Sequence, residues 1–228
     1  MHEPESSAAE RLAIILRAIE KARRRFGPPP EVVRLVAVSK TVPAEGIGPI
    51  LAAGQRLFGE NRVQETQEKW PALRAEFPDI ELHLIGPLQT NKVRDAVALF
   101  DCIESLDREK LAIALRVEMS RVQRPLPVYV QVNIGEEPQK SGIAPREAVA
   151  FVSRCRTEHG LWVEGLMCIP PESVPPGPYF AHLAVLAREA GVSHLSMGMS
   201  ADFETAIAMG ATEVRIGSAL FGTRPRAP

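Results

Sequence analysis

The chain has 228 residues, 45% of them hydrophobic and 24% charged, which allows one large α/β domain or two small ones. A net charge of −1 and a pI near 6.5 give no electrostatic reason to expect binding to nucleic acid or to an anionic membrane surface. The first ten residues are polar and no apolar run is long enough to cross a bilayer, so we expect a cytoplasmic protein without membrane segments.

A regular alternation of helices and short apolar segments runs along the chain. A helix is predicted over about 8–26, where apolar residues recur at helical spacing from Leu12 to Ile19. Strands are predicted at 34–41, 56–59, 81–86, 102–105, 127–134, 161–169, 193–197 and 213–216. Helices are predicted between them at 44–53, 61–77, 91–99, 108–121, 145–159, 179–190 and 202–209.

Eight strands that alternate with helices are typical of a (β/α)8 TIM barrel. An open, doubly wound sheet is the alternative, but such a sheet more often has a glycine-rich loop after its first strand. The corresponding turn here, 39–43, contains no glycine. We therefore predict a single barrel domain over 1–228, with the extra helix at about 8–26 covering the barrel floor or filling its side.

The cysteine and histidine spacings predict neither a disulfide framework nor a metal site. Cys102, Cys155 and Cys168 are scattered without a CxxC pair, and we expect them to be buried, reduced thiols. The five histidines lack the HExxH-like spacing of a metal-binding helix. No metal ion is expected.

Lys40 ends the first predicted strand, whose continuous apolar run indicates burial on both faces. Ligand sites of α/β proteins lie at the carboxyl ends of parallel strands. A partly desolvated amine there is more easily deprotonated, and a neutral amine is what Schiff-base chemistry with an aldehyde requires. The alternative is that Lys40 simply reaches solvent at the end of its strand.

Two loops near the end of the chain have the features of a phosphate-binding site. The segments 196–200 and 216–222 follow the seventh and eighth predicted strands, and both contain glycine and serine. In this class of barrel, such loops bind phosphate through backbone N–H groups at a helix N-terminus. The hydroxyls of Ser200 and Ser218 add donors. Alternatively, Ser200 only caps a helix and the glycines only form turns.

An aldehyde-reactive lysine and a phosphate cradle at one barrel mouth indicate pyridoxal 5′-phosphate (PLP) as the cofactor. Arg215 then acquires a role at the pyridine nitrogen. Because a guanidinium is always charged, it donates a hydrogen bond there and keeps the nitrogen unprotonated, which makes the ring a weaker electron sink. The alternative for Arg215 is a structural ion pair with Glu213 or Glu60.

Seven short motifs follow one another between Val33 and Gly222. They are 35–40 (LVAVSK), 58–61 (FGEN), 83–92 (HLIGPLQTNK), 140–143 (KSGI), 165–167 (GLM), 195–202 (LSMGMSAD) and 214–217 (VRIG). Taken together, they resemble the pyridoxal phosphate homeostasis protein family. The resemblance implies a barrel like the N-terminal domain of fold-type III PLP enzymes such as alanine racemase.

The resemblance also assigns roles to individual residues. It implies that PLP forms an aldimine with Lys40, that Asn61 lies near the cofactor and that Arg215 lies at the ring nitrogen. Departures from the family pattern are small: Val42 stands where a lysine is frequent, and 201–203 is a local variant. The phosphate-binding residues implied by the resemblance are Ser200, Gly217 and Ser218.

Two functions from different classes are compatible with these residues. The first is a non-catalytic, monomeric PLP-binding protein of intracellular PLP homeostasis, which buffers PLP or delivers it to PLP-dependent apoenzymes. The second is a small fold-type III enzyme, a racemase or decarboxylase. Alanine racemase-like enzymes add a β-rich domain with a catalytic tyrosine, whereas Tyr129 and Tyr179 here begin a strand and a helix. We favour the first; an aldolase that uses Lys40 without PLP is a weaker third.

Overall fold

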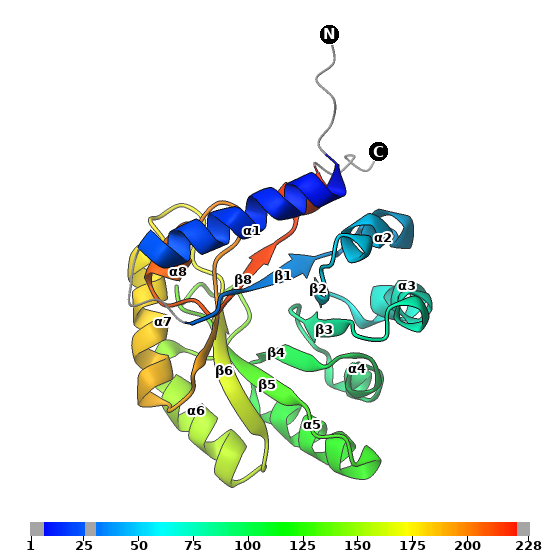
Figure 1. The fold of residues 1–228 in the computed structure, drawn as a ribbon. Helices are drawn as coiled ribbons and strands as arrows, with labels where there is room; N and C mark the ends of the chain where they lie inside the picture. Colours follow the sequence, from blue (N-terminus) through cyan, green and yellow to red (C-terminus); the bar gives the residue numbers. More distant parts are fainter. Residues whose placement is uncertain (1–6, 26–30, 223–228) are drawn as a thin grey trace.

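A closed barrel of parallel strands, joined in chain order, forms the centre of the protein (Figure 1). The computed structural model describes residues 7–25 and 31–222. The strands are β1 (Arg34–Val38), β2 (Leu57–Glu60), β3 (Glu81–Leu84), β4 (Cys102–Leu106), β5 (Pro127–Val132), β6 (Trp162–Cys168), β7 (His194–Ser196) and β8 (Glu213–Ile216). The predicted (β/α)8 barrel is confirmed and the open sheet is excluded, because β8 pairs with β1.

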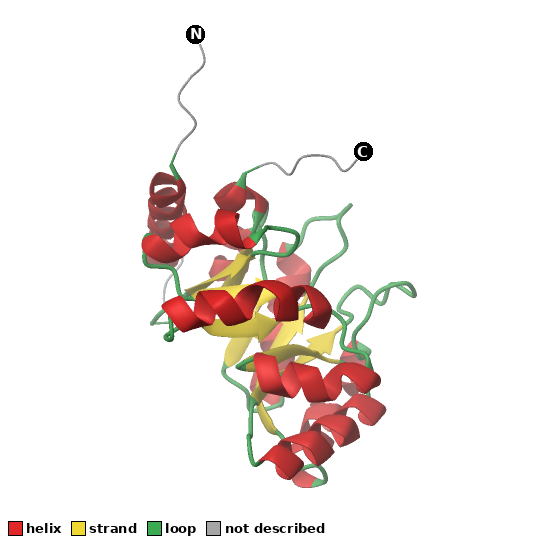
Figure 2. Ribbon diagram, turned by 90° about the vertical axis from the view of Figure 1, so that its right-hand side faces the viewer, coloured by secondary structure: helices red, strands yellow, loops and turns green. Residues whose placement is uncertain are grey.

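Helices surround the strands on the outside of the barrel (Figure 2). They are α1 (Ala8–Arg25), α2 (Ala44–Ala52), α3 (Val63–Glu76), α4 (Val93–Leu99), α5 (Glu109–Val122), α6 (Pro145–Thr157), α7 (Gly177–Glu189), α8 (Phe203–Ala208), α9 (Ser218–Phe221) and the 3-10 turn η1 (Thr90–Lys92). The predicted elements are present with small shifts of their ends. The predicted last residue of the first helix, Phe26, lies outside the described residues.

Helix α1 fills the side of the barrel rather than its floor. It packs against α8, α9 and α2 on the outside of the barrel (Figure 1). Leu12 and Ile15 are buried in this contact, and the Arg11 side chain donates to the Leu220 carbonyl oxygen over 2.7 Å. Because α9 is only one turn long, the helical ring on this side is completed by the start of the chain. Leu16, which shares the apolar spacing, is 45% exposed.

Barrel closure aligns the first and last strands residue by residue. Arg34 is opposite Glu213 and Val36 is opposite Arg215. Since side chains alternate along a strand, Glu213 and Arg215 both point into the barrel, while Val214 between them packs in the main core against the helices. The interior of this barrel therefore contains charges as well as apolar side chains.

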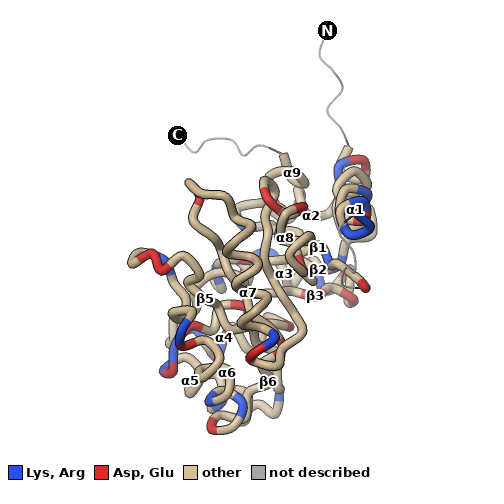
Figure 3. Tube along the Cα trace, turned by 90° about the vertical axis from the view of Figure 1, so that its left-hand side faces the viewer, with Lys and Arg blue, Asp and Glu red and all other residues tan. Residues whose placement is uncertain are grey.

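The remaining sequence expectations concern cysteines, membranes and charge. The three cysteines are free and buried, as predicted. Among the helices within residues 7–25 and 31–222, none is both long and apolar enough to span a bilayer. On the side of the molecule drawn in Figure 3, basic and acidic residues are interspersed along the trace.

Candidate functional site

The turn after β1 places Lys40 at the mouth of the barrel, two residues beyond the end of the strand. The sequence had predicted that the strand itself reaches Lys40. Ser39 is buried, Lys40 is half-buried, and Thr41 has a φ of 61°. A β-branched residue rarely adopts this left-handed conformation, and such strain clusters at functional sites. The Glu65 carboxylate accepts a hydrogen bond from the Thr41 N–H and thereby holds Thr41 in this conformation.

Lys69 clamps the turn that carries Lys40. Its ammonium donates to the carbonyl oxygens of Ser39, over 2.8 Å, and Val42, over 3.1 Å, which flank the turn. It also lies 2.8 Å from the carboxylates of both Glu60 and Glu65. Only 8% of the Lys69 side chain is exposed, so its three N–H groups depend on these four acceptors. The clamp therefore fixes both ends of the Lys40 turn to α3.

Glu60 is the buried counter-charge of this clamp. Besides pairing with Lys69, its Oε1 accepts from the Ser39 hydroxyl over 2.6 Å and from the Trp70 indole over 3.0 Å. Burial raises the pKa of Glu60, against the hydrogen bonds from Lys69 and Ser39, which favour the carboxylate. Sequence reasoning missed the clamp. The one available signal was the helical i,i+4 spacing of Glu65 and Lys69.

The loops after β7 and β8 bring the two predicted phosphate-binding serines together. The hydroxyl oxygens of Ser200 and Ser218 lie 3.4 Å apart. Gly217 lies against the end of β1: a Cβ at this position would come within 3.0 Å of the Val38 carbonyl oxygen. Because Val38 is two residues before Lys40, the loop that contains Gly217 and Ser218 adjoins the turn with the lysine. The strand order thus unites residues far apart in sequence.

Arg215 is buried and held in one orientation. Its guanidinium donates to the Ser196 hydroxyl and to the Cys168 carbonyl oxygen, each over 2.8 Å. Ser196 in turn donates to Glu104. Within residues 7–25 and 31–222, Arg215 makes no direct ion pair with Glu213 or Glu60, so those pairings are wrong.

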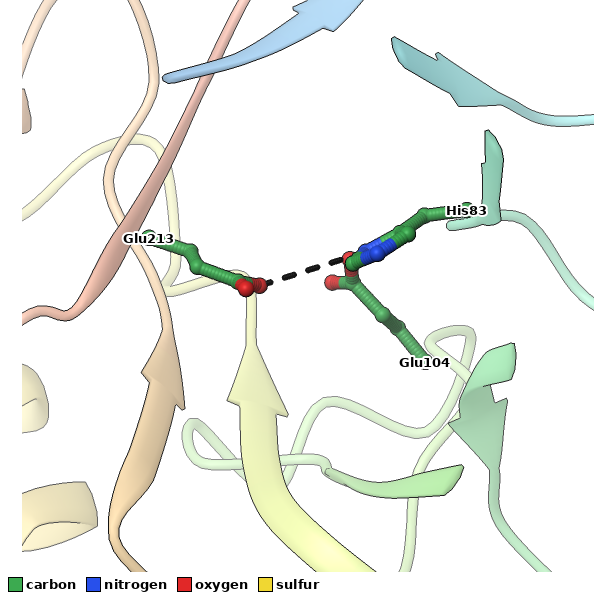
Figure 4. Close-up of side chains that lie close together, drawn as sticks. All are labelled: His83, Glu104 and Glu213. Carbon is green, nitrogen blue, oxygen red and sulfur yellow. Dashed lines mark hydrogen bonds and ion pairs between the residues drawn. The ribbon is translucent and has the colours of Figure 1, made fainter. Parts of the chain in front are cut away.

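A histidine between carboxylates lies deeper in the barrel (Figure 4). His83 Nδ1 is 2.7 Å from Glu104 and Nε2 is 2.8 Å from Glu81, while Glu213 lies 4.0 Å away. Burial by itself would lower the pKa of His83, but the hydrogen bonds to Glu104 and Glu81 outweigh it and raise the pKa to about 10. The protonated imidazole donates through both nitrogens, so it has no lone pair for a metal ion.

Charges in this interior network balance one another. Three acidic residues face three basic ones: Glu81, Glu104 and Glu213 against His83, Arg34 and Arg215. Burial, followed by repulsion from Glu104, raises the pKa of Glu213 to about 7. The Tyr129 hydroxyl donates to Glu213 over 3.2 Å. Sequence spacing could not reveal this network, because its members come from five different strands.

Asn61 completes the set of predicted site residues. It follows β2, whose Gly59 pairs with Val38, and this register places Asn61 across from Lys40. The Asn61 backbone packs tightly against Gly86, where a Cβ would lie 2.3 Å from the Asn61 carbonyl oxygen. The barrel mouth therefore presents an amine, an amide, two hydroxyls and a fixed guanidinium on the adjacent strands β7, β8, β1 and β2.

The model of the alanine racemase N-terminal domain family matches residues 11–225. A pyridoxal phosphate homeostasis protein of Vibrio cholerae is 40% identical, over 96% of this chain and 97% of its own. The structure of PipY from Synechococcus elongatus with PLP bound has a TM-score of 0.81 and 38% identity, covering 94% of this chain and all of PipY.

Alanine racemase from Clostridium difficile shares the fold at a greater distance. Its TM-score is 0.69 with 17% identity, and the match covers 94% of this chain but only 57% of the racemase. At this identity the likeness concerns the barrel alone.

Proposed function

The chain belongs to the pyridoxal phosphate homeostasis protein family, whose barrel is that of the alanine racemase N-terminal domain, and we propose that it binds PLP at the barrel mouth for intracellular PLP homeostasis. We propose that residues 1–228 belong to this single barrel domain. The observation that carries the proposal is the convergence of Lys40 and the Ser200–Ser218 pair across neighbouring strands.

The donor set fits this cofactor. Hydroxyls and backbone N–H groups at Ser200, Gly217 and Ser218 suit a phosphate. Gly217 packs closely on the end of β1, where a Cβ would lie 3.0 Å from the Val38 carbonyl oxygen, so a side chain here would crowd β1. Arg215 supplies a permanent hydrogen-bond donor for the ring nitrogen, and Asn61 adds an amide beside it.

When bound, PLP supplies an aldehyde that condenses with a primary amine, with loss of one water molecule. Lys40 is the amine that we assign to this bond. The Lys69 clamp and the strained Thr41 backbone fix the position of the Lys40 turn. This protein thereby holds the amine ready at the mouth, next to the loops that hold the phosphate.

We propose further that the protein does not catalyse a reaction of its own. Racemisation needs a base on one face of the substrate carbon and an acid on the other. Tyr129 is buried, and its hydroxyl donates a hydrogen bond to Glu213. Tyr179 lies at the start of α7, partly buried against the core. Arg215 is also a cation, whereas many PLP enzymes have a carboxylate at the ring nitrogen that strengthens the electron sink.

The partners and location follow from this function as parts of the same proposal. A cytoplasmic, monomeric protein that holds PLP reversibly can release it to PLP-dependent apoenzymes. A fold-type III enzyme, racemase or decarboxylase, is the other candidate function, and a turnover assay distinguishes the two.

Peptide mapping tests the proposal directly. Purified protein incubated with PLP is expected to absorb at about 420 nm, and borohydride reduction is expected to fix the label on Lys40. Lys40→Ala should lose the band. A label found on Lys92 or Lys140, with Lys40 unmodified, would overturn the assignment.

A further inference from the structure

A cavity opens on the same face of the barrel as Lys40. It lies between the loop after β2 and the loop after β3 and has a volume of about 620 Å³. That size is in the range of small-molecule sites. The cavity is separate from the loops after β7 and β8 that we assign to phosphate, since β1 lies between the two pairs of loops.

Positive charge and amides dominate the polar lining of this cavity. Its polar side chains are Asn61, Arg62, Gln64, Gln89 and Lys92, and no carboxylate lines it. Each of these five side chains offers N–H donors, and no carboxylate in the lining neutralises the two cations. A cavity built from cations and amides is complementary to an oxyanion.

The same five side chains are not used by the fold. Within residues 7–25 and 31–222, none of them makes a hydrogen bond or ion pair. Arg108, which follows β4, does make such contacts: it pairs with Asp107 and donates to the Leu88 carbonyl oxygen over 2.8 Å. Arg108 thus holds the wall of the cavity in place, whereas Arg62 and Lys92 have donors to spare for a ligand.

The backbone around the cavity favours the same kind of ligand. Helix α3 begins at Val63, and its N-cap residue Arg62 makes no side-chain capping bond. The partial positive charge of the first turn therefore adds to that of the two cations. The tight packing of Asn61 on Gly86 joins the two loops that bound the cavity, so their positions depend on each other.

We propose that this cavity is a binding site for a small molecule that carries a carboxylate or phosphate group. The ligand would lie beside the cofactor site, with Asn61 between them, and be held by Arg62, Lys92 and the neighbouring amides. Carboxylates and phosphates share the oxyanion that this lining recognises, and the experiment below separates them.

Calorimetric titration of the full-length, PLP-loaded protein tests the site. Succinate and inorganic phosphate are the two oxyanion probes, and succinamide is the neutral probe. We expect one oxyanion to bind and succinamide not to bind. Arg62→Gln and Lys92→Met should each weaken that binding about tenfold, the size of one charge-assisted hydrogen bond. Stronger binding of succinate identifies the ligand as a carboxylate, and stronger binding of phosphate identifies it as a phosphate ester.

Lys110→Met is the matched control, because it removes one exposed positive charge from α5, outside the cavity. It should change the affinity less than twofold. The absorbance at about 420 nm should stay unchanged in all three variants, so loss of oxyanion binding is distinguishable from loss of the cofactor. The proposal is overturned if neither oxyanion binds, if succinamide binds as well as succinate, or if Lys110→Met weakens binding as much as the other two.

Discussion

The ammonium nitrogen of Lys69 lies 2.8 Å from the backbone carbonyl oxygen of Ser39, the residue before Lys40. A buried lysine on α3 thus fixes the backbone from which the proposed cofactor-binding lysine extends. The buried partner Glu60 makes the arrangement expensive to break, because an ion without its counter-charge is poorly tolerated inside a protein.

Removal of the Lys69 ammonium should therefore affect both stability and PLP binding. We expect Lys69→Met to lower the free energy of unfolding by about 3–5 kcal/mol, since Glu60 stays buried without its partner. PLP affinity should fall as well, because Ser39 and Val42 lose their shared donor. Urea unfolding and absorbance titration measure the two effects.

The double variant Lys69→Met with Glu60→Gln separates these two effects. It removes both charges, so much of the stability should return while the PLP affinity stays low. Full recovery of the affinity would show that Lys69 does not position the Lys40 turn.

The hydroxyl of Ser200 is expected to contribute to phosphate binding. Ser200→Ala should weaken PLP binding by about 1–3 kcal/mol, the range for one lost charge-assisted hydrogen bond, without unfolding the barrel. Equilibrium dialysis measures the affinity. Ser193→Ala removes an exposed hydroxyl at the start of β7, away from the barrel mouth, and serves as the control. Equal affinity of Ser200→Ala and the parent would contradict the phosphate assignment.

The contribution of His83 to the free energy of unfolding should decrease as the pH rises. Its folded pKa is raised from 6.5 to about 10, so its stabilising contribution is fully present below pH 6.5 and is lost as the pH rises through 10. His83→Gln should cost about 3 kcal/mol or more at neutral pH, and the difference from the parent should shrink toward pH 10.

Urea unfolding over this pH range measures the His83 contribution. His182→Gln, which replaces an exposed histidine on α7, provides the control and should cost much less stability at neutral pH than His83→Gln. A difference between parent and His83→Gln that grows with pH would show that His83 is neutral in the folded protein.

Amino acids should not be racemised by the PLP-loaded protein. Lys40 serves one face of a bound substrate, and the Tyr129 hydroxyl is turned toward Glu213 inside the barrel. Incubation with L- or D-alanine, serine or lysine, followed by chiral chromatography, should show no interconversion above that of free PLP. Turnover of about 1 s⁻¹, the low end for ordinary enzymes, would favour the racemase instead.

Sequence patterns were sufficient to predict the architecture, because the residues of each strand or helix carry the pattern of that element by themselves. The apolar run 35–38 predicts a buried strand by itself, and eight such runs predict the barrel. Lys40 and Ser200 could be placed at the mouth for the same reason, as the ends of strands meet on one face. Leu16 shares the apolar spacing of α1 and is nevertheless exposed, since helical spacing does not say how wide the buried face of a helix is.

The contacts that hold the site were beyond sequence patterns. Lys69 lies 30 residues after Ser39, and Ser196 lies 92 residues after Glu104, so no local spacing connects them. Parallel strands pair through their register, and only the register shows which inward side chains share a layer. The orientation of Arg215 therefore became clear only from the closed barrel.

Closure of the barrel by β8 also makes the core depend on contacts between the first strand and the last. Glu213 and Arg215 arrive together on the last strand, and each joins groups already placed by β1, β3, β4 and β7. Until β8 inserts, β1 has an open edge, Arg34 and His83 lack Glu213, and Ser196 lacks the guanidinium of Arg215. Contacts between residues so far apart in sequence form slowly, so a growing chain cannot complete its core until almost all of it has been synthesised.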